Sequence, residues 1–240
     1  MPNAKRIVIP TYPIIDAIAK ISESLLSRLD RRLYLELLAE HARHQGVAVH
    51  AYCLMHNHVH IIATPHDING LHHTFERVEG DYARAIHIRL HRRGHLWQRR
   101  FRSSPMDESH FWAGMVYVEQ NPVRAHLVES AEQWRWSCAR AHLEDRPGDL
   151  LDFSLWRRRF TPESWREQLS LGVRDAALLE RIREATRTGR PSAEEAFLRE
   201  LEGQMNARLL PRKRGRPRKL PLSAISSQSE TPSIGSAAAG

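Results

Sequence analysis

The sequence AYCLMHNHVHIIATP, residues 51–65, carries the clearest local pattern in the chain. Apolar and polar residues alternate over 47–55 and again over 59–63, which is typical of two half-buried strands. The short polar link His56-Asn57 lies between them. The pattern therefore predicts an antiparallel β-hairpin.

The second strand of this hairpin begins with a pair of histidines. Residues two apart on a strand point to the same face, so we expect the imidazoles of His58 and His60 side by side, with Val59 turned into the core. The apolar Ile61-Ile62 that follows places the pair on a half-buried sheet. Two neutral imidazoles and one further ligand would leave open positions on a divalent metal. A pair of surface histidines is the alternative.

Other segments flank the hairpin. Leucines at helical spacing before Gly46 and an apolar stripe before Gly94 predict two helices, and Asn121-Pro122 ends or kinks a third. In chain order we expect a strand at 5–9, a helix at 28–44, the hairpin, a helix at 71–93, an extended segment at 96–103 and a helix at 108–118.

The chain divides near residue 145. All fifteen histidines lie between His41 and His142, and the turn Arg146-Pro147-Gly148 is a plausible hinge. Beyond it we expect short helices at 162–169, 175–188 and 193–210, then a basic, Ser/Ala/Gly-rich and disordered tail. The expected parts are a domain over 1–145, a small helical region over 146–210 and the tail over 211–240.

The positive charge is concentrated in two places. The 240 residues carry a net charge of +8. Residues 77–102 hold eight arginines against two acidic residues, and residues 212–240 hold six Lys/Arg against one. The rest of the chain is slightly acidic. Two basic patches predict a polyanionic partner, and nucleic acid fits best.

Composition excludes several classes of protein. Mean hydropathy is −0.52, no apolar run approaches a membrane span, and the N-terminus lacks a signal-peptide pattern. We therefore expect a cytoplasmic protein without a membrane partner. Cys53 and Cys138 cannot form a disulfide framework or a cysteine-rich zinc site, so both are expected as buried thiols.

Two further segments suggest chemistry. Tyr117 and Asn121 share one helix face at i and i+4, where a phenol near a metal could attack a phosphodiester and the amide could complete the metal site or orient the phosphate. The alternative is a buried tyrosine and an ordinary Asn-Pro helix end. The segment 94–101 interleaves aromatics with arginines, which suits stacking on unpaired bases. A solvated loop anchored in the core by Trp97 is equally compatible.

Together and in this order, these segments resemble the REP-associated tyrosine transposases, in the single-tyrosine branch of the His-hydrophobic-His (HUH) endonucleases, with an IS200-like transposase domain. The resemblance rests on AYCLMHNHVHIIATP (51–65), GHLWQRRF (94–101), YVEQNPVRAHLV (117–128) and WRWSCARAHL (134–143).

The resemblance implies an α+β fold with a ferredoxin-like central antiparallel sheet and packed helices. It implies His58, His60 and Asn121 as ligands of Mg²⁺ or Mn²⁺ and Tyr117 as nucleophile. The implied activity is single-strand cleavage and strand transfer on hairpin or REP-like DNA through a 5′-phosphotyrosine. We expect a monomer or homodimer, associated with the nucleoid.

The DNA contacts that we expect come from the two basic patches and the tyrosine segment. They are Arg84, Arg92, Arg93, His95, Trp97, Arg99, Arg100, Arg102, Arg124, Arg214 and Arg216. The last two belong to RGRP, the core of an AT-hook, whose extended arginines would enter an A·T-rich minor groove. A generic phosphate-binding tail is the alternative.

The chain departs from the family at His56, Arg99 and His126, and more seriously over 14–30, where the family has a strand of different sequence. A pair of compensating frameshifts would leave such a block. Because that strand should be central to the sheet, a DNA-binding relative that does not cleave is an alternative function. The spacing of His56, His58 and His60 also resembles the histidine-triad nucleotide hydrolases, which is a third hypothesis.

Overall fold

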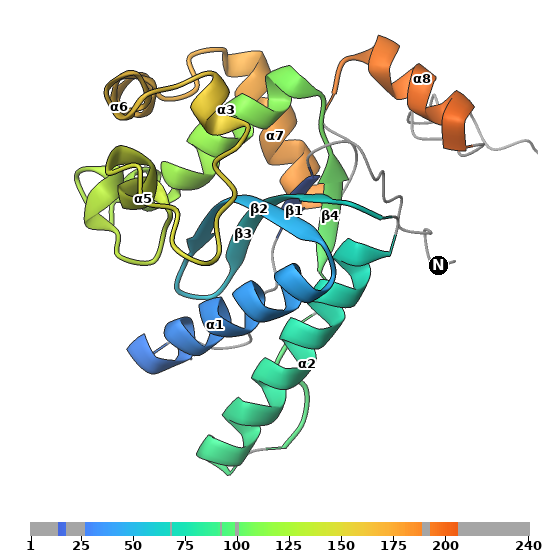
Figure 1. Cartoon of the computed structure of the whole chain (residues 1–240), viewed down its shortest axis with the longest axis vertical. Helices are drawn as coiled ribbons and strands as arrows, with labels where there is room; N and C mark the ends of the chain where they lie inside the picture. The colour runs from blue at the N-terminus through green and yellow to red at the C-terminus, as the bar shows by residue number, and fades with distance from the viewer. Residues whose placement is uncertain are drawn as a thin grey trace, which may run out of the picture. The chain divides into compact units, whose positions relative to one another are not determined.

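The computed structural model describes residues 14–17, 27–67, 69–91, 93–98, 101–188 and 193–205. Within them the fold is mixed α+β, with a small antiparallel sheet and packed helices (Figure 1). The strands are β1 (Ile14–Ala17), β2 (Val47–Leu54), β3 (Val59–Pro65) and β4 (Arg102–Pro105). The helices are α1 (Arg28–His44), α2 (Gly70–Leu90), α3 (Glu108–Glu119), α4 (Asn121–Arg124), α5 (Ala139–Leu143), α6 (Pro162–Leu171), α7 (Ala176–Thr188) and α8 (Glu195–Met205), with 3-10 turns η1 (Ala131–Gln133) and η2 (Trp156–Arg158).

The sheet has the strand order β2-β3-β1-β4, and every neighbouring pair is antiparallel. The predicted hairpin is confirmed, with the amide of Met55 donating to the carbonyl of His58 at 2.8 Å across the turn. Strand β1 comes from the divergent segment 14–30 and lies between β3 and β4. The expectation of a central strand there is confirmed for residues 14–17.

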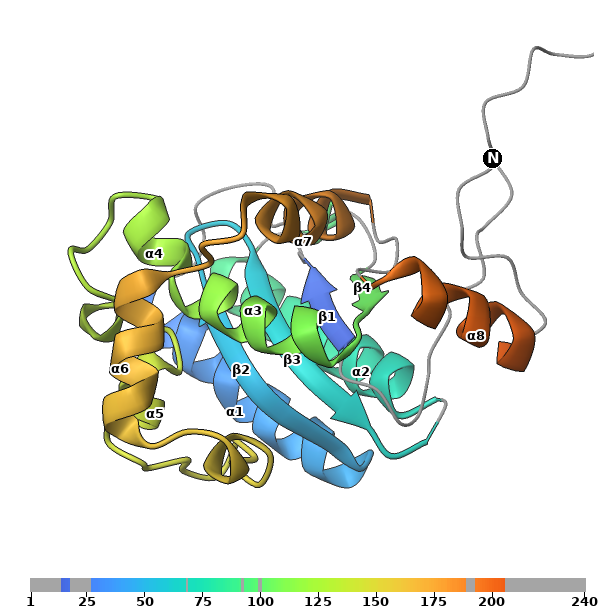
Figure 2. The ribbon, with the colours of Figure 1, turned by 90° about the horizontal axis from the view of Figure 1, so that it is seen from above.

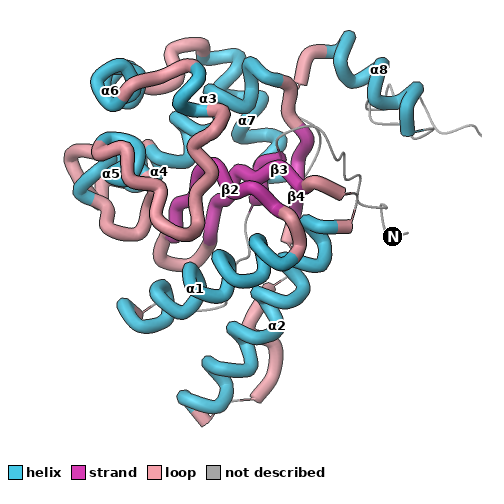
Figure 3. Tube along the Cα trace, in the orientation of Figure 1, coloured by secondary structure: helices cyan, strands magenta, loops and turns pink. Residues whose placement is uncertain are grey.

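Helices α1 and α2 cover one face of the sheet (Figures 1 and 3). The predicted helix at 28–44 has the observed bounds of α1, because Ser27 and Asp30 form a capping box at its start. Its buried Tyr34 meets Tyr82 of α2 edge-on, with ring centroids 5.5 Å apart. Asp30, buried in α1, also pairs with Arg89 of α2.

Helices α3 and α7 lie over the opposite face, and α5 and α6 pack beside the C-terminal end of α3 (Figure 2). The amide of Asp152 donates to the carbonyl of Val49 at 2.7 Å, so the chain after the proposed hinge runs back alongside β2. The division near residue 145 stays a prediction.

The predicted helices beyond the hinge are confirmed as α6, α7 and α8, with the end of α6 and the starts of α7 and α8 shifted by one or two residues. Residues 206–210 of the last predicted helix lie outside the described residues. Helix α2 stops at Leu90, before the predicted end at Arg93, because His91 adopts a left-handed conformation (φ 49°). In the extended segment expected at 96–103, Arg102 and Ser103 belong to β4, and residues 99 and 100 lie outside the described residues. The strand expected at 5–9 and the tail after 210 lie outside the described residues. None of the helices in the described ranges is long and apolar enough to cross a membrane.

The stability of the fold should depend on a buried leucine of α1 and should hardly change when an exposed leucine of the same helix is replaced. Leu38 is fully buried, whereas Leu29 is 68% exposed. We expect Leu38→Ala to lower the free energy of unfolding by about 2–5 kcal/mol, because it leaves a cavity between helix and sheet. Leu29→Ala, the same change on the same helix, should alter it by less than about 0.5 kcal/mol. Denaturant titrations check both, and equal losses would contradict this packing.

Candidate functional site

The histidine pair lies at the start of β3, on the face of the sheet that α3 covers. The rings of His58 and His60 are 4.9 Å apart between centroids and nearly perpendicular. His58 Nδ1 lies 2.7 Å from Asn57 Oδ1. Because an amide oxygen only accepts, His58 Nδ1 donates this hydrogen bond.

His60 is suited to ligate a cation. Only 3% of its surface is exposed. Burial, with help from His58 and Arg124, lowers the pKa of His60 well below its ordinary value, so the imidazole is neutral. Its buried Nδ1 has no hydrogen-bond partner among the described residues. A neutral, buried imidazole with an unsatisfied nitrogen fits a metal ligand.

Tyr117 faces the histidine pair from the last turn of α3. The centroids of the Tyr117 and His60 rings are 6.2 Å apart, and the rings are nearly perpendicular. Tyr117 is 9% exposed. Residues nearly sixty positions apart in the sequence therefore meet between α3 and β3.

Asn121 opens α4, directly after α3, and is 8% exposed. Its Oδ1 accepts a hydrogen bond from Arg124, and its buried Nδ2 has no partner in the described structure. The guanidinium of Arg124 lies 3.8 Å from the centroid of the Tyr117 ring. Burial lowers the pKa of Arg124, and its contact with the Tyr117 phenol works in the opposite direction. Arg124 thus joins the tyrosine to the asparagine.

A buried polar cluster lies behind this site and was not predicted. Glu119 Oε1 accepts from Cys138 Sγ at 3.0 Å and from His142 Nδ1 at 2.6 Å, and Glu119 Oε2 accepts from Trp165 Nε1 at 2.9 Å. All four side chains are fully buried. The one signal in the sequence was a glutamate directly after the apolar run Met115–Val118. Cys53 and Cys138 are free and buried, as predicted.

The third histidine of the hairpin does not join the pair. His56 is exposed in the turn, and its ring lies against Trp134 with centroids 5.5 Å apart. The turn thus separates His56 from β3, which carries His60.

The predicted DNA-binding residues lie in different surroundings. Arg84, Arg93 and His95 are exposed, and Arg84 Nη1 lies 3.4 Å from Asp81. Arg102 is half-buried and donates to the carbonyl of Arg187. Arg92, Arg99, Arg100, Arg214 and Arg216 lie outside the described residues.

Trp97 is half-buried and anchored. Its Nε1 donates to the carbonyl of Glu79 at 2.8 Å, and its ring packs 5.4 Å from that of Tyr82. The side chain therefore fixes the segment after α2 to the core. Between α2 and this segment lies a groove of about 480 Å³, with Gly80 and Ala83 on one side and Leu96 and Phe101 on the other.

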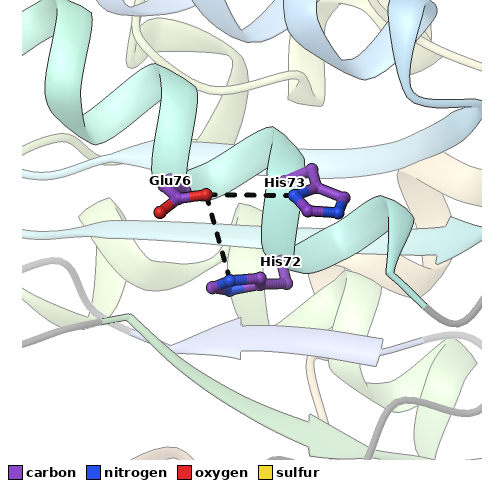
Figure 4. Close-up of side chains that lie close together, drawn as sticks. All are labelled: His72, His73 and Glu76. Atoms are coloured by element: carbon purple, nitrogen blue, oxygen red, sulfur yellow. Dashed lines mark ion pairs between the residues drawn. The ribbon is translucent and has the colours of Figure 1, made fainter.

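A second set of possible metal ligands lies at the rim of this groove. His72 Nε2 and His73 Nδ1 approach the same oxygen of Glu76, at 3.9 and 3.8 Å (Figure 4). The three side chains are between 46% and 62% exposed. Exposed pairs at this separation on one helix contribute little, so we interpret the set as surface ion pairs.

Residues 13–121 match a family model described as "Transposase IS200 like". No curated protein matches the chain. Among solved structures, one described as "Structure of the REP associates tyrosine transposase bound to a REP hairpin" is similar at 18% identity. Its TM-score is 0.49, and the match covers 64% of this chain and 96% of that one.

The buried His60 should make stability sensitive to pH. Its pKa in the folded protein lies below the value of about 6.5 expected when unfolded, so only the unfolded chain takes up this proton as the pH falls. The contribution is complete above pH 6.5 and lost progressively below it. We expect the free energy of unfolding to fall less between pH 7 and pH 5 in His60→Gln than in the wild type.

Denaturant titrations at the two pH values check this expectation. Because burial also lowers the pKa of His50, some pH dependence should remain. His44→Gln removes an exposed imidazole and serves as the matched control. An unchanged slope in His60→Gln would show that His60 is protonated equally in both states.

Proposed function

We propose that this chain cleaves and joins single-stranded DNA through Tyr117, and the match of residues 13–121 to the model described as "Transposase IS200 like" supports this. The substrate class is hairpin-bearing, REP-like DNA, as the motif resemblance implies. The observation that supports this proposal best is the approach of the Tyr117 ring to the His58 and His60 pair. The strand order β2-β3-β1-β4, with the element order β-α-β-β-α-β, supports the ferredoxin-like form of the HUH fold.

His58, His60 through its unsatisfied Nδ1 and Asn121 through its amide would hold Mg²⁺ or Mn²⁺. When bound, the cation supplies Lewis-acid polarisation of the scissile phosphate and neutralises charge on the leaving oxygen. Asn121 Oδ1 accepts from Arg124, so the asparagine would exchange this hydrogen bond to become a ligand.

Tyr117 is the nucleophile in this proposal. Its phenol oxygen attacks phosphorus in line, the bond to the 3′ oxygen breaks, and the products are a 5′-phosphotyrosine and a free 3′-hydroxyl. The phenol gives up its proton and the leaving oxygen takes one up. Arg124, at the Tyr117 ring, provides positive charge where negative charge develops. The covalent intermediate keeps the energy of the phosphodiester, so another 3′-hydroxyl can reverse the step.

The exposed arginines of α2 and the following segment would bind the DNA backbone through phosphate contacts. Because the indole N–H of Trp97 is tied to the Glu79 carbonyl, its contribution is limited to the part of the ring that remains exposed. Because Arg124 lies over the Tyr117 ring, it would contact the scissile phosphate, unlike the exposed arginines of α2.

A DNA-binding relative that does not cleave is the second candidate, and the departure of segment 14–30 from the family favours it. Strand β1 pairs on both sides over the four residues that the structure describes there. Both candidates bind DNA, so a covalent adduct distinguishes them.

The phenol oxygen of Tyr117 should be required for this adduct. We expect the wild type, incubated with hairpin-bearing single-stranded DNA and Mn²⁺, to form a denaturation-resistant protein–DNA species. Tyr117→Phe should form none and keep its DNA affinity within about threefold, since it removes only the nucleophile. Gel shift under denaturing and native conditions measures the two quantities.

Tyr82→Phe is the matched control, because its buried hydroxyl has no partner in the described residues. It should form the adduct at the wild-type rate. Adduct formation by Tyr117→Phe would remove Tyr117 from the mechanism. Binding without adduct in the wild type would favour the non-cleaving relative.

The basic tail should add affinity without affecting the chemistry. Residues 211–240 contain six Lys/Arg. In a plot of log Kd against the logarithm of the salt concentration, each phosphate that the tail neutralises adds about 0.7–0.9 to the slope. We expect a chain ending at residue 210 to bind more weakly, with a shallower slope, and to form the adduct at the wild-type rate when saturated. Equal slopes would show that the tail makes no phosphate contacts.

A further inference from the structure

Helix α3, which carries Tyr117, is hydrogen-bonded to helices α5 and α6 through Glu119. The carboxylate of Glu119 is fully buried and accepts hydrogen bonds from Cys138, from His142 of α5 and from Trp165 of α6. A buried carboxylate is costly unless such donors surround it, so these contacts bind the end of α3 to α5 and α6.

Glu119 lies two residues after Tyr117. Two residues correspond to a rotation of about 200° on a helix, so the two side chains leave α3 on nearly opposite faces. Tyr117 faces the histidine pair of β3, and Glu119 faces the α5–α6 side. Any rotation of the helix that moves the carboxylate therefore moves the phenol.

A second contact, one residue further along, supports the same connection. Gln120 Nε2 donates to the carbonyl of Leu169 at 2.5 Å. Leu169 lies one turn after Trp165 on α6. Two successive residues of the tyrosine segment thus bind two successive turns of one helix.

We propose that α6 is part of the catalytic unit, and that Trp165 and Glu119 are positioning residues for Tyr117. This inference rests on the proposed function. In-line attack requires the phenol oxygen within a few tenths of an ångström of its productive position, and small displacements cost much of the rate. Helix α6 therefore sets the rate of cleavage, and the exposed arginines of α2 set affinity.

Two tryptophans of this region provide a matched pair of variants. Trp165→Phe keeps an aromatic ring and removes the N–H that Glu119 accepts. Trp156→Phe makes the same change at a buried neighbour whose Nε1 has no partner in the described part of the chain. The Trp156 and Trp165 rings are 6.3 Å apart, so both variants perturb one aromatic cluster.

We expect Trp165→Phe to slow single-turnover adduct formation by about 10- to 100-fold at saturating DNA, with the Kd for the hairpin unchanged within about twofold. Trp156→Phe should leave both quantities within about twofold of the wild type. Equal rates in the two variants would overturn the proposal, as would a loss in Trp165→Phe that appears only in Kd.

Hydrogen exchange provides a readout that needs neither catalysis nor metal. In Trp165→Phe, amides of peptides covering 115–124 should exchange faster than in the wild type and in Trp156→Phe. Faster exchange with an unchanged adduct rate would assign Glu119 a structural role only and overturn the inference. If the wild type forms no adduct but hydrogen exchange is still faster in Trp165→Phe, the proposed function is refuted. The connection between α6 and α3 is then still supported.

Gln120→Met is the second variant, for the case that Trp165→Phe does not fold. It removes the donor to Leu169 without leaving a buried charge unpaired. The adduct rate should fall in the same direction, again without a change in Kd. A wild-type rate in Gln120→Met, together with an unfolded Trp165→Phe, would show that α6 stabilises the domain without positioning Tyr117.

Discussion

The antiparallel pairing of β3 on both of its edges is the constraint on which the site depends. Strand β3 pairs with β2 and with β1, and this register sets His60 opposite Cys53 on one side and Ala17 on the other. Because side chains alternate between faces, a slip of one residue would turn His58 and His60 away from α3 and towards α1 and α2. The register thus decides whether the imidazoles meet Tyr117.

Local patterns were sufficient for the elements that carry the site. The alternation around His56-Asn57 predicted the hairpin, and helical periodicity predicted α1 and α3 closely, because these signals arise from neighbours in the sequence. The sequence predicts the end of α2 three residues too late, because Gly94 is the obvious terminator and the left-handed conformation of His91 carries no strong sequence signal. The meeting of His60 with Tyr117 was an inference from resemblance. Periodicity alone contains no information about that distance.

The Glu119 cluster shows a different limit of sequence reasoning. Its members are spread from Glu119 to Trp165, and each is unremarkable alone. A charged residue is rarely buried without partners, so Glu119 after an apolar run was a signal that buried donors must exist elsewhere. It could not indicate which residues supply them. Arg124 shows the same limit, because an arginine counted with the DNA contacts is half-buried and lies over the Tyr117 ring.

Helix α3 therefore separates two polar environments of opposite kind. On the sheet side, burial and the positive charge of Arg124 both disfavour a proton on His60, which keeps the imidazole neutral. On the other side, three donors surround the carboxylate of Glu119. A helix that was only apolar could slide or rotate at low cost between the sheet and α6, because dispersion contacts are not directional. Hydrogen bonds to a buried charge are directional, and rotating away from them leaves that charge unpaired. The hydrogen bonds of Glu119 thus restrain the rotation of α3 at its C-terminal end, as those of the buried His110 do at its start, and the rotation that satisfies Glu119 presents Tyr117 to the histidines.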